Sequence, residues 1–351
     1  MNKKIAVILF NLGGPDKAES IRPFLINFFM DKNIIRAPIF VRYFVSRLIA
    51  WRRSKKEAGD SYGMLGGKSP LLENTEAQAE ALQAVLGDGF KVFVVMRYWH
   101  PMAEQVTKDV QQFNPDEVIL LPLYPQYSTT TTRSSFEDWF KHSKNIGLNP
   151  KTQIICCYPF DKGLIVASVD NIKKSFIDFK EKYGVTPRLL FSAHGLPEKI
   201  IKDGDSYQWA CIESAHKIAR ATGIDNLDYS ICYQSRVGPL KWIDPSTEEA
   251  LEVAAHDKKG VLIYPHAFVS EHVETLVEIE EEYRHVAKEL GILAFERVAT
   301  VSCHPAFIAG LADLVQAQIG AGQYPNEFNP RVCPLEFSQC CQNEAQFCNK
   351  T

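Results

Sequence analysis

A single histidine stands on a short turn in the segment Phe191-Ser-Ala-His-Gly-Leu-Pro197, directly after an apolar run. Gly195 removes a side chain next to His194, and Pro197 stiffens the turn, which leaves an imidazole exposed and positioned. An imidazole titrates close to neutral pH, so it can accept a proton or bind a metal. The bland alternative is a histidine that only lines a loop, and a functional His194 is the hypothesis carried forward.

Three glutamates follow at a spacing of four residues, Glu274, Glu278 and Glu282. On a helix this spacing places them on one face, where their like charges repel. One interpretation is a solvated acidic face, and the other is a row of carboxylates that passes a divalent cation inward. Imidazole and carboxylate groups are both common ligands of divalent metal ions.

Apolar runs of strand length alternate with helical patterns along the whole chain, which predicts βαβ units and parallel sheets, an α/β fold. Strands are predicted at residues 5–10, 90–96, 117–123, 152–158, 188–193, 228–233 and 260–264. Helices are predicted at residues 73–86, 102–113, 163–183, 206–221, 272–290 and 305–319. Two sheets fit the length of 351 residues better than one.

Polar and aromatic residues recur where these predicted strands end, which is the edge at which open α/β sheets bind ligands. The segments concerned are 11–15, 97–101, 124–128, 194–197, 234–238 and 265–274. A crevice lined by tyrosines, a tryptophan, histidines and a carboxylate suits a large, flat aromatic ligand together with a metal.

Composition excludes several classes of protein. The net charge of −3 gives no electrostatic basis for binding nucleic acid, and no apolar stretch approaches the roughly 20 residues of a membrane span. The apolar start is short and breaks at Asn11, so it is interpreted as a first strand and not a signal peptide. These features predict a cytoplasmic protein in a reducing compartment, whose nine cysteines form no disulfide.

The motifs resemble those of the ferrochelatases, lyases of haem biosynthesis that insert Fe²⁺ into protoporphyrin IX to form protohaem and release two protons. The resemblance runs nearly end to end and rests on residues 11–15, 66–70, 96–101, 124–128, 190–197, 233–239 and 270–276. It implies two Rossmann-like domains facing each other across a porphyrin cleft. Residues 1–150 would form the first domain, 151–320 the second, with packing of its last helix on the first domain as an alternative, and 321–351 a cysteine-rich extension.

The resemblance also implies roles for single residues. His194 and Glu274 would be the catalytic pair and the site for substrate Fe²⁺, with Glu278 and Glu282 continuing the acidic row. The porphyrin pocket would be lined by Leu12, Arg97, Tyr98, Tyr124, Phe268 and His272. The face from which iron enters, and whether His194 acts as base or as ligand, stay open.

Other substrates and functions are alternatives at this point. Coproporphyrin would suit the same site, and chelatases that act on sirohydrochlorin share the fold. The aromatic side chains of residues 36–53, which would form the lip of the cleft, favour an apolar porphyrin. A non-catalytic protein that binds a tetrapyrrole is the alternative from another class. The oligomeric state, including a homodimer, is also open.

The C-terminal segment has four cysteines in a symmetric pattern, Cys333, Cys340, Cys341 and Cys348. Clustered thiolates in a reducing compartment indicate an iron–sulfur or zinc site, and a disordered tail is the alternative. Many ferrochelatases carry a 2Fe–2S cluster at this extension. Such enzymes often take one ligand from just after the Tyr-Pro-Gln-Tyr-Ser motif, where this chain has Thr129, so Cys156 or Cys157 is a possible substitute ligand.

Residues 36–53 form an amphipathic segment with Phe40, Phe44, Leu48 and Trp51 at helical spacing among arginines. One interpretation is a helix that faces the core. The other is an interfacial helix that touches the inner face of the membrane and forms the lip for porphyrin entry, and the resemblance favours it. Its arginines would then also be available to porphyrin propionates.

Overall fold

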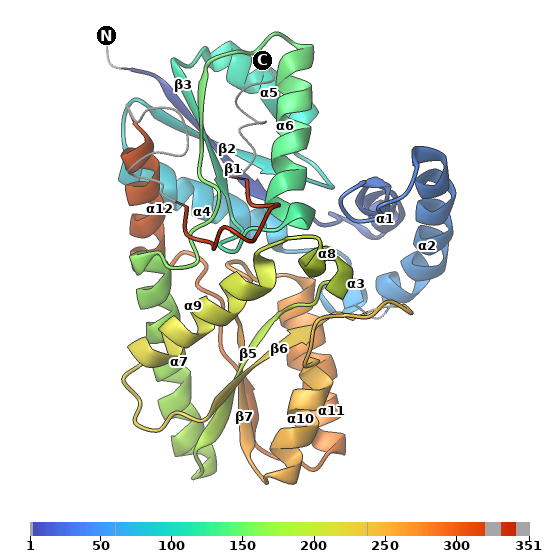
Figure 1. Cartoon of the computed structure of the whole chain (residues 1–351), viewed down its shortest axis with the longest axis vertical. Helices are drawn as coiled ribbons and strands as arrows, with labels where there is room; N and C mark the ends of the chain where they lie inside the picture. Colours follow the sequence, from blue (N-terminus) through green and yellow to red (C-terminus); the bar gives the residue numbers. More distant parts are fainter. Residues whose placement is uncertain (1–2, 60, 237, 320–330, 342–351) are drawn as a thin grey trace. The chain divides into compact units, whose positions relative to one another are not determined.

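The computed structural model describes residues 3–59, 61–236, 238–319 and 331–341. The chain divides into two compact units. Unit 1 comprises Met1–Cys157, Leu311–Pro334 and Gln339–Thr351, and unit 2 comprises Tyr158–Gly310 and Leu335–Ser338. Each unit contains a four-stranded parallel sheet with helices, which confirms the α/β class predicted from the alternating pattern (Figure 1).

The sheet of unit 1 has the strand order β2-β1-β3-β4. Its strands are β1 (Ile5–Asn11), β2 (Phe90–Met96), β3 (Glu117–Pro122) and β4 (Lys151–Ile154). Every residue of β1 is buried, as expected for a central parallel strand covered on both faces. The strand predicted over 152–158 already ends at Ile154, so Cys156 and Cys157 lie in the segment beyond it.

The helices of unit 1 bury one face of this sheet in an aromatic core. Phe10 of β1 packs edge-on against Phe136 and Trp139, and all three side chains are fully buried. The helical elements before residue 150 are η1 (Ala18–Ser20), α1 (Ile21–Met30), α2 (Ile39–Gly59), α3 (Ser61–Met64), α4 (Leu71–Leu86), α5 (Ala103–Phe113), the π-helical η2 (Thr129–Arg133) and α6 (Ser134–Asn145).

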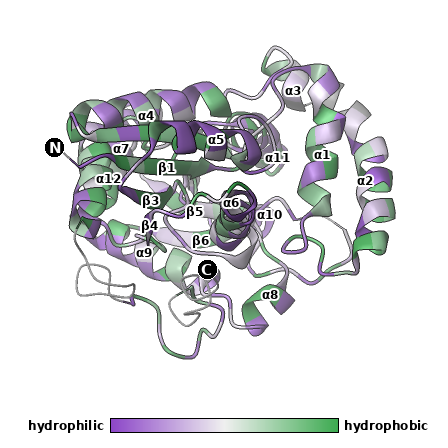
Figure 2. Cartoon of the chain, turned by 90° about the horizontal axis from the view of Figure 1, so that it is seen from above, coloured by the Kyte–Doolittle hydropathy of each residue, from purple (hydrophilic) through white to green (hydrophobic). Residues whose placement is uncertain are grey.

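Helices α1 and α2 lie side by side, away from the strands of the first sheet (Figures 1 and 2). Helix α2 exposes large apolar side chains that a core-facing helix would bury, since Phe44 is 70% exposed and Trp51 56% exposed. The interpretation of residues 36–53 as a helix that faces the core is therefore wrong for these two aromatic positions.

The sheet of unit 2 has the strand order β6-β5-β7-β8. Its strands are β5 (Pro187–His194), β6 (Tyr229–Gln234), β7 (Gly260–Pro265) and β8 (Phe295–Arg297). Alternate residues of β5 enter different cores: Leu189 and Phe191 pack in one cluster and Leu190 in another. Both faces of the sheet are thus covered, which leaves its carboxyl edge for a site.

The helices of unit 2 cover these two faces. They are α7 (Lys162–Tyr183), α8 (Glu198–Lys202), α9 (Tyr207–Ala221), α10 (Thr247–His256), the π-helix η3 (Glu274–Tyr283) and α11 (Arg284–Glu289), and α12 (Pro305–Gln318) follows. Helix α10 starts in a capping box, in which Ser246 accepts from the Glu249 N–H and Glu249 accepts from the Ser246 N–H.

Candidate active site

His194 and Glu274 meet at the carboxyl edge of the second sheet. His194 is the last residue of β5, and Glu274 is the first residue of η3, 80 positions later in the chain. His194 Nδ1 lies 2.8 Å from Glu274 Oε2. The side chains are 36% and 23% exposed, so the pair is held by the fold and still open to solvent. The structure therefore joins two residues that are predicted to act together.

The acidic row lies on a π-helix, where an ordinary α-helix was expected. A π-helix has wider turns with i→i+5 hydrogen bonds, and such segments occur frequently at functional sites. Glu274 and Glu278 are neighbours, because the Ser235 hydroxyl lies 3.3 Å from Glu274 Oε2 and 2.6 Å from Glu278 Oε2. Glu282, four residues further along, is exposed. The row thus extends from the His194–Glu274 pair to solvent.

Glu278 is surrounded by hydrogen-bond donors. Besides Ser235, the Gln234 side-chain amide donates to Oε2 at 3.0 Å and the Tyr283 hydroxyl donates to Oε1 at 3.2 Å. Ser235 belongs to the predicted edge segment 234–238 but was not singled out, and Tyr283 was not predicted as a member of the site. The only signal for Ser235 is its place directly after β6, where it takes a left-handed φ of 63°.

The charges in this group shift each other's pKa. Burial opposes the charged form of His194, but the facing Glu274 carboxylate outweighs it and raises the pKa of His194. Burial likewise opposes ionisation of Glu274, and the charge and hydrogen bond of His194 overcome this and lower its pKa. For Glu278, burial and then the charge of Glu274 raise the pKa to about 7. At neutral pH the site therefore holds an imidazolium–carboxylate pair beside a carboxyl that readily exchanges a proton.

His272 and Phe268 join the same edge. The ring centroids lie 4.7 Å apart, nearly perpendicular, and His272 Nδ1 accepts the backbone N–H of Glu274 at 3.1 Å. That bond places the proton of neutral His272 on Nε2. Two of the predicted pocket residues thus lie directly against the start of η3.

The turn after His194 has a glycine at position 195 for a steric reason. A Cβ on Gly195 would lie 2.8 Å from the carbonyl oxygen of Gln234, closer than real Cβ atoms come to a backbone atom. The Gly195 N–H donates to that same oxygen at 2.8 Å. Gly195 therefore allows the end of β5 to stay paired with β6, which holds the imidazole of His194 at the edge of the sheet.

The other predicted pocket residues lie in unit 1. Arg97 and Tyr98 both bond Asp31 Oδ2, at 3.0 Å from Nη2 and 2.8 Å from the hydroxyl. The Tyr98 N–H donates to the Leu12 carbonyl at 3.0 Å, and Tyr124 is close enough for its charged form to affect Arg97. The structure thus gathers Leu12, Arg97, Tyr98 and Tyr124 in one region. Asp31, which ties Arg97 to Tyr98, carries no sequence signal and was missed.

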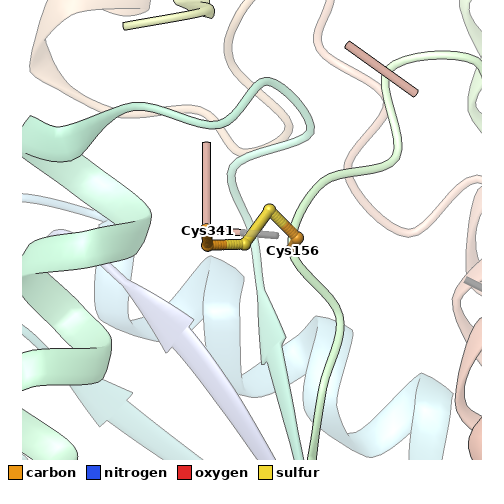
Figure 3. The surroundings of a disulfide bond; sticks show 2 residues. All are labelled: Cys156 and Cys341. Carbon is orange, nitrogen blue, oxygen red and sulfur yellow. A yellow bond between two sulfur atoms is a disulfide. The ribbon is translucent and has the colours of Figure 1, made fainter. Parts of the chain in front are cut away.

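Five cysteines gather where β4 ends. Cys156 and Cys341 form a disulfide of 2.09 Å (Figure 3), so the prediction that no disulfide forms is wrong: the fold brings their Cα atoms to 6.4 Å. A hydrogen bond from Cys340 lowers the pKa of Cys333 to about 6, which burial opposes. Burial and then the charge of Cys333 raise the pKa of Cys157 to about 12.

No group of three or more His, Cys, Asp or Glu side chains is arranged to hold a metal ion in the part of the chain that the structure describes. Two of the five gathered cysteines are taken up by the disulfide. Cys348 lies outside the described residues.

An ion pair anchors the loop that leads into η3, and its loss should be measurable. Arg297 Nη1 lies 2.9 and 3.1 Å from the two carboxylate oxygens of Glu271, which also accept the Thr300 N–H and the Thr275 hydroxyl. Burial alone would raise the pKa of Glu271, but Arg297 and these donors hold it below its usual 4.5. We expect Glu271→Gln to lower the free energy of unfolding by about 2 kcal/mol at pH 7.

The sign of this effect follows from the lowered pKa. The Glu271 carboxylate stabilises the folded state above the unfolded-state pKa, and the contribution is lost as pH falls through the lower folded-state pKa. Urea denaturation from pH 7 to pH 3 should therefore show the wild type and Glu271→Gln converging at low pH. Glu281→Gln, an exposed change on η3, the helix that follows this loop, should match the wild type throughout. A gap that stays constant with pH would contradict the role of the ion pair.

Comparisons with known proteins identify related sequences and structures. The family model described as Ferrochelatase matches residues 4–319. A ferrochelatase of Hyphomonas neptunium is 47% identical over 98% of this chain and 96% of its own length, and one of Pelagibacter ubique is 45% identical over 97% and 99%. Among solved structures, SirB from Bacillus subtilis with Fe³⁺ matches with a TM-score of 0.51 at 11% identity, covering 89% of this chain and 94% of SirB.

The SirB match shows a shared fold alone, because its identity to this chain is low. The family model and the relatives show the family as well, because each spans most of the chain and the relatives are 47% and 48% identical to it. They confirm the resemblance that the motifs around His194 and Glu274 indicate. The chain belongs to the ferrochelatase family.

Proposed function

We propose that this protein inserts Fe²⁺ into protoporphyrin IX to form protohaem, with release of the two pyrrole protons. The observation that carries the proposal is the contact of His194 with Glu274, with Glu278 beside them at the edge of the second sheet. A free porphyrin must lose two N–H protons before its four nitrogens can hold iron. The site supplies groups of both kinds that this reaction requires, proton acceptors and weak ligands for Fe²⁺.

Each residue of the site has a role that follows from its position. His194 and Glu274 share one proton in the resting pair, so binding of a cation there would expel that proton and leave a neutral imidazole with a carboxylate. That imidazole can ligate Fe²⁺ or accept a pyrrole proton. Glu278, held by Ser235 and Gln234, is the next acceptor along the helix. Glu282 at the exposed end is the first carboxylate that an arriving cation meets.

The substrate is tested by offering different tetrapyrroles side by side under anaerobic conditions. Protoporphyrin IX, coproporphyrin and sirohydrochlorin would each be supplied with Fe²⁺, and the initial rates compared. The proposal expects the highest kcat/KM with protoporphyrin IX. A preference for coproporphyrin or sirohydrochlorin would change the substrate and retain the metal insertion. No turnover with any of them would contradict the enzymatic function.

The outer end of the acidic row is expected to act through iron affinity. Glu282→Gln removes an exposed charge eight positions after Glu274, so kcat should stay unchanged while the KM for Fe²⁺ rises about threefold. Steady-state kinetics at low ionic strength, where exposed charges act most strongly, measure both values. Glu289→Gln, an exposed glutamate on α11, is the matched control and should leave both constants unchanged. Equal constants for Glu282→Gln and the wild type would make Glu282 part of a solvated face.

We also propose that the gathered cysteines bind a 2Fe–2S cluster. Such a cluster takes four thiolates. Cys333 and Cys340 are in contact, and the charge of Cys333 raises the pKa of Cys157. Cys341 is bonded to Cys156. Two-electron reduction of the disulfide by an external thiol, which is itself oxidised to a disulfide, would free its two thiols. These residues then fit the required number of ligands. The cluster would be held by Cys333, Cys340, Cys341 and either Cys156 or Cys157, with Cys348 as the alternative fourth ligand.

The exposed face of α2 supports a peripheral contact with a membrane surface. Phe40, Phe44, Leu48 and Trp51 are all at least half exposed, and Arg47 and Arg52 lie among them. Apolar side chains flanked by arginines are typical of helices that lie in the interface of anionic bilayers. Among the helices that the structure describes, none has the length and apolar character to cross a bilayer.

This contact predicts a loss of vesicle binding in the double variant Phe44→Glu/Trp51→Glu. Because both side chains would leave the acyl boundary and bring like charge to an anionic surface, affinity should fall at least about tenfold. Co-sedimentation with phosphatidylglycerol-containing vesicles measures it. Ile177→Glu, at a residue of α7 that is 54% exposed, is the control and should bind as the wild type does. The same affinity for all three proteins would exclude α2 as the contact.

A further inference from the structure

Three buried polar side chains form a hydrogen-bonded chain that ends at Glu278. Thr247, Ser192 and Gln234 are all fully buried. Thr247 Oγ1 lies 3.3 Å from Ser192 Oγ, which lies 2.8 Å from Gln234 Oε1, and the Gln234 amide nitrogen lies 3.0 Å from Glu278 Oε2. Polar groups at such depth are costly unless they are paired, so each link has an energetic reason.

The chemistry of the groups gives this chain one direction. In its ionised form Glu278 only accepts hydrogen bonds, and this form requires the Gln234 amide to turn its N–H₂ side toward Oε2. Its carbonyl oxygen then needs a donor, and the Ser192 hydroxyl is the group in place. Since the Ser192 proton is used there, Ser192 can only accept at its 3.3 Å contact with Thr247, whose hydroxyl also lies 3.5 Å from Cys232 Sγ. Ser192 thus decides which end of the amide faces the carboxylate.

Gln234 also connects Glu278 to the histidine turn. It pairs with His194 in the register of β5 and β6, and its carbonyl accepts the Gly195 N–H at 2.8 Å. One residue therefore contacts the turn that carries the imidazole with its backbone and the second carboxylate with its side chain. A shift of this side chain would change the place of Glu278 relative to the His194–Glu274 pair.

We propose that Ser192 and Gln234 are positioning residues that present Glu278 as a hydrogen-bond acceptor beside Glu274, and so set the affinity of the site for Fe²⁺. The inference rests on the proposed function. Without the Ser192 hydroxyl the amide is free to turn its carbonyl toward Glu278, and two facing acceptors repel. Without the amide, Glu278 loses one of the two donors to Oε2. In both cases the carboxylate leaves its place.

The test is a double-mutant cycle on the purified full-length protein. Gln234→Met, Ser192→Ala and the double variant are compared in kcat, KM for Fe²⁺ and KM for protoporphyrin. Loss of a hydrogen bond to a charged group should raise the KM for Fe²⁺ about tenfold in Gln234→Met, and the indirect effect of Ser192→Ala should be about threefold. The KM for porphyrin should not change. If Ser192 acts only through Gln234, the double variant equals Gln234→Met.

Ser168→Ala is the matched control, because Ser168 is equally buried and bonds Leu164 and Tyr264 away from the site. It should retain every wild-type constant. If Ser192→Ala does not fold, Ser192→Cys, a weaker donor of similar size, should still raise the KM for Fe²⁺. Multiplying effects in the double variant, or an unchanged KM for Fe²⁺ in Gln234→Met, would overturn the inference while wild-type turnover upholds the function. A wild type without turnover would overturn the proposed function itself.

Discussion

Replacing His194 with alanine is expected to reduce Fe²⁺ insertion by about a thousandfold or more while porphyrin binding and the fold persist. A positioned acid–base group contributes about 10²- to 10⁴-fold to a rate, and His194 is also a proposed ligand of the metal. The side chain is 36% exposed and ends a strand, so its removal leaves little buried space. Anaerobic insertion kinetics, porphyrin fluorescence titration and thermal unfolding separate the three effects.

His285→Ala is the control for this change. His285 lies on α11, its side chain is 71% exposed, and it pairs only with the exposed Glu289 among the contacts described. Its removal should leave turnover at the wild-type level. Near-normal turnover in His194→Ala would remove His194 from the mechanism, and an equal loss in both variants would point to a general effect on the protein.

Replacing Cys333 with serine is expected to remove colour, stability and activity together. A metal cluster that forms only in the folded state stabilises that state. Losing one ligand therefore weakens cluster binding and lowers the stability of the fold. Cys333 is buried and in contact with Cys340, so it is one of the gathered cysteines. Iron and sulfide analysis, the visible spectrum and thermal unfolding of anaerobically purified protein measure the loss.

Cys303→Ser provides the control, since Cys303 is exposed and lies outside the gathered cysteines. The double variant Cys156→Ser/Cys157→Ser locates the fourth ligand: lost colour places it in the internal pair, and retained colour places all ligands in the tail. Colourless wild-type protein that contains stoichiometric zinc and is fully active would defeat the assignment of an iron–sulfur cluster.

The strands could be predicted because a parallel sheet covered on both faces requires continuous apolar runs, as in β1 and β7. The prediction missed β8, since three residues at the edge of a sheet carry too little pattern. It extended β4 beyond Ile154 because the apolar residues that follow are also buried, although the strand itself ends at Ile154, with the Ile155 N–H still donating to the Leu120 carbonyl at 2.9 Å. Burial can be predicted from a local run of apolar residues, whereas the pairing of a strand depends on segments far away in the sequence.

The site was predictable only in part for the same reason. His194 could be singled out by its glycine neighbour, and the glutamates by their spacing. A spacing of four fits an α-helix and a π-helix alike, so the actual form of η3 could not be foreseen. Asp31 and Ser192 acquire their roles through partners 66 and 42 positions away, which no local pattern records. The Cys156–Cys341 disulfide likewise depends on a contact across 185 positions.

The central claim is that this site exchanges two pyrrole protons for Fe²⁺, and the most direct measurement counts both partners of that exchange. Anaerobic protein, protoporphyrin IX and Fe²⁺ would be mixed in weak buffer with a pH indicator, while the loss of porphyrin fluorescence is followed. The account predicts many turnovers per chain, with two protons released for each porphyrin consumed. Quenching that stops at one porphyrin per chain, without proton release, would contradict it and indicate a protein that only binds the tetrapyrrole.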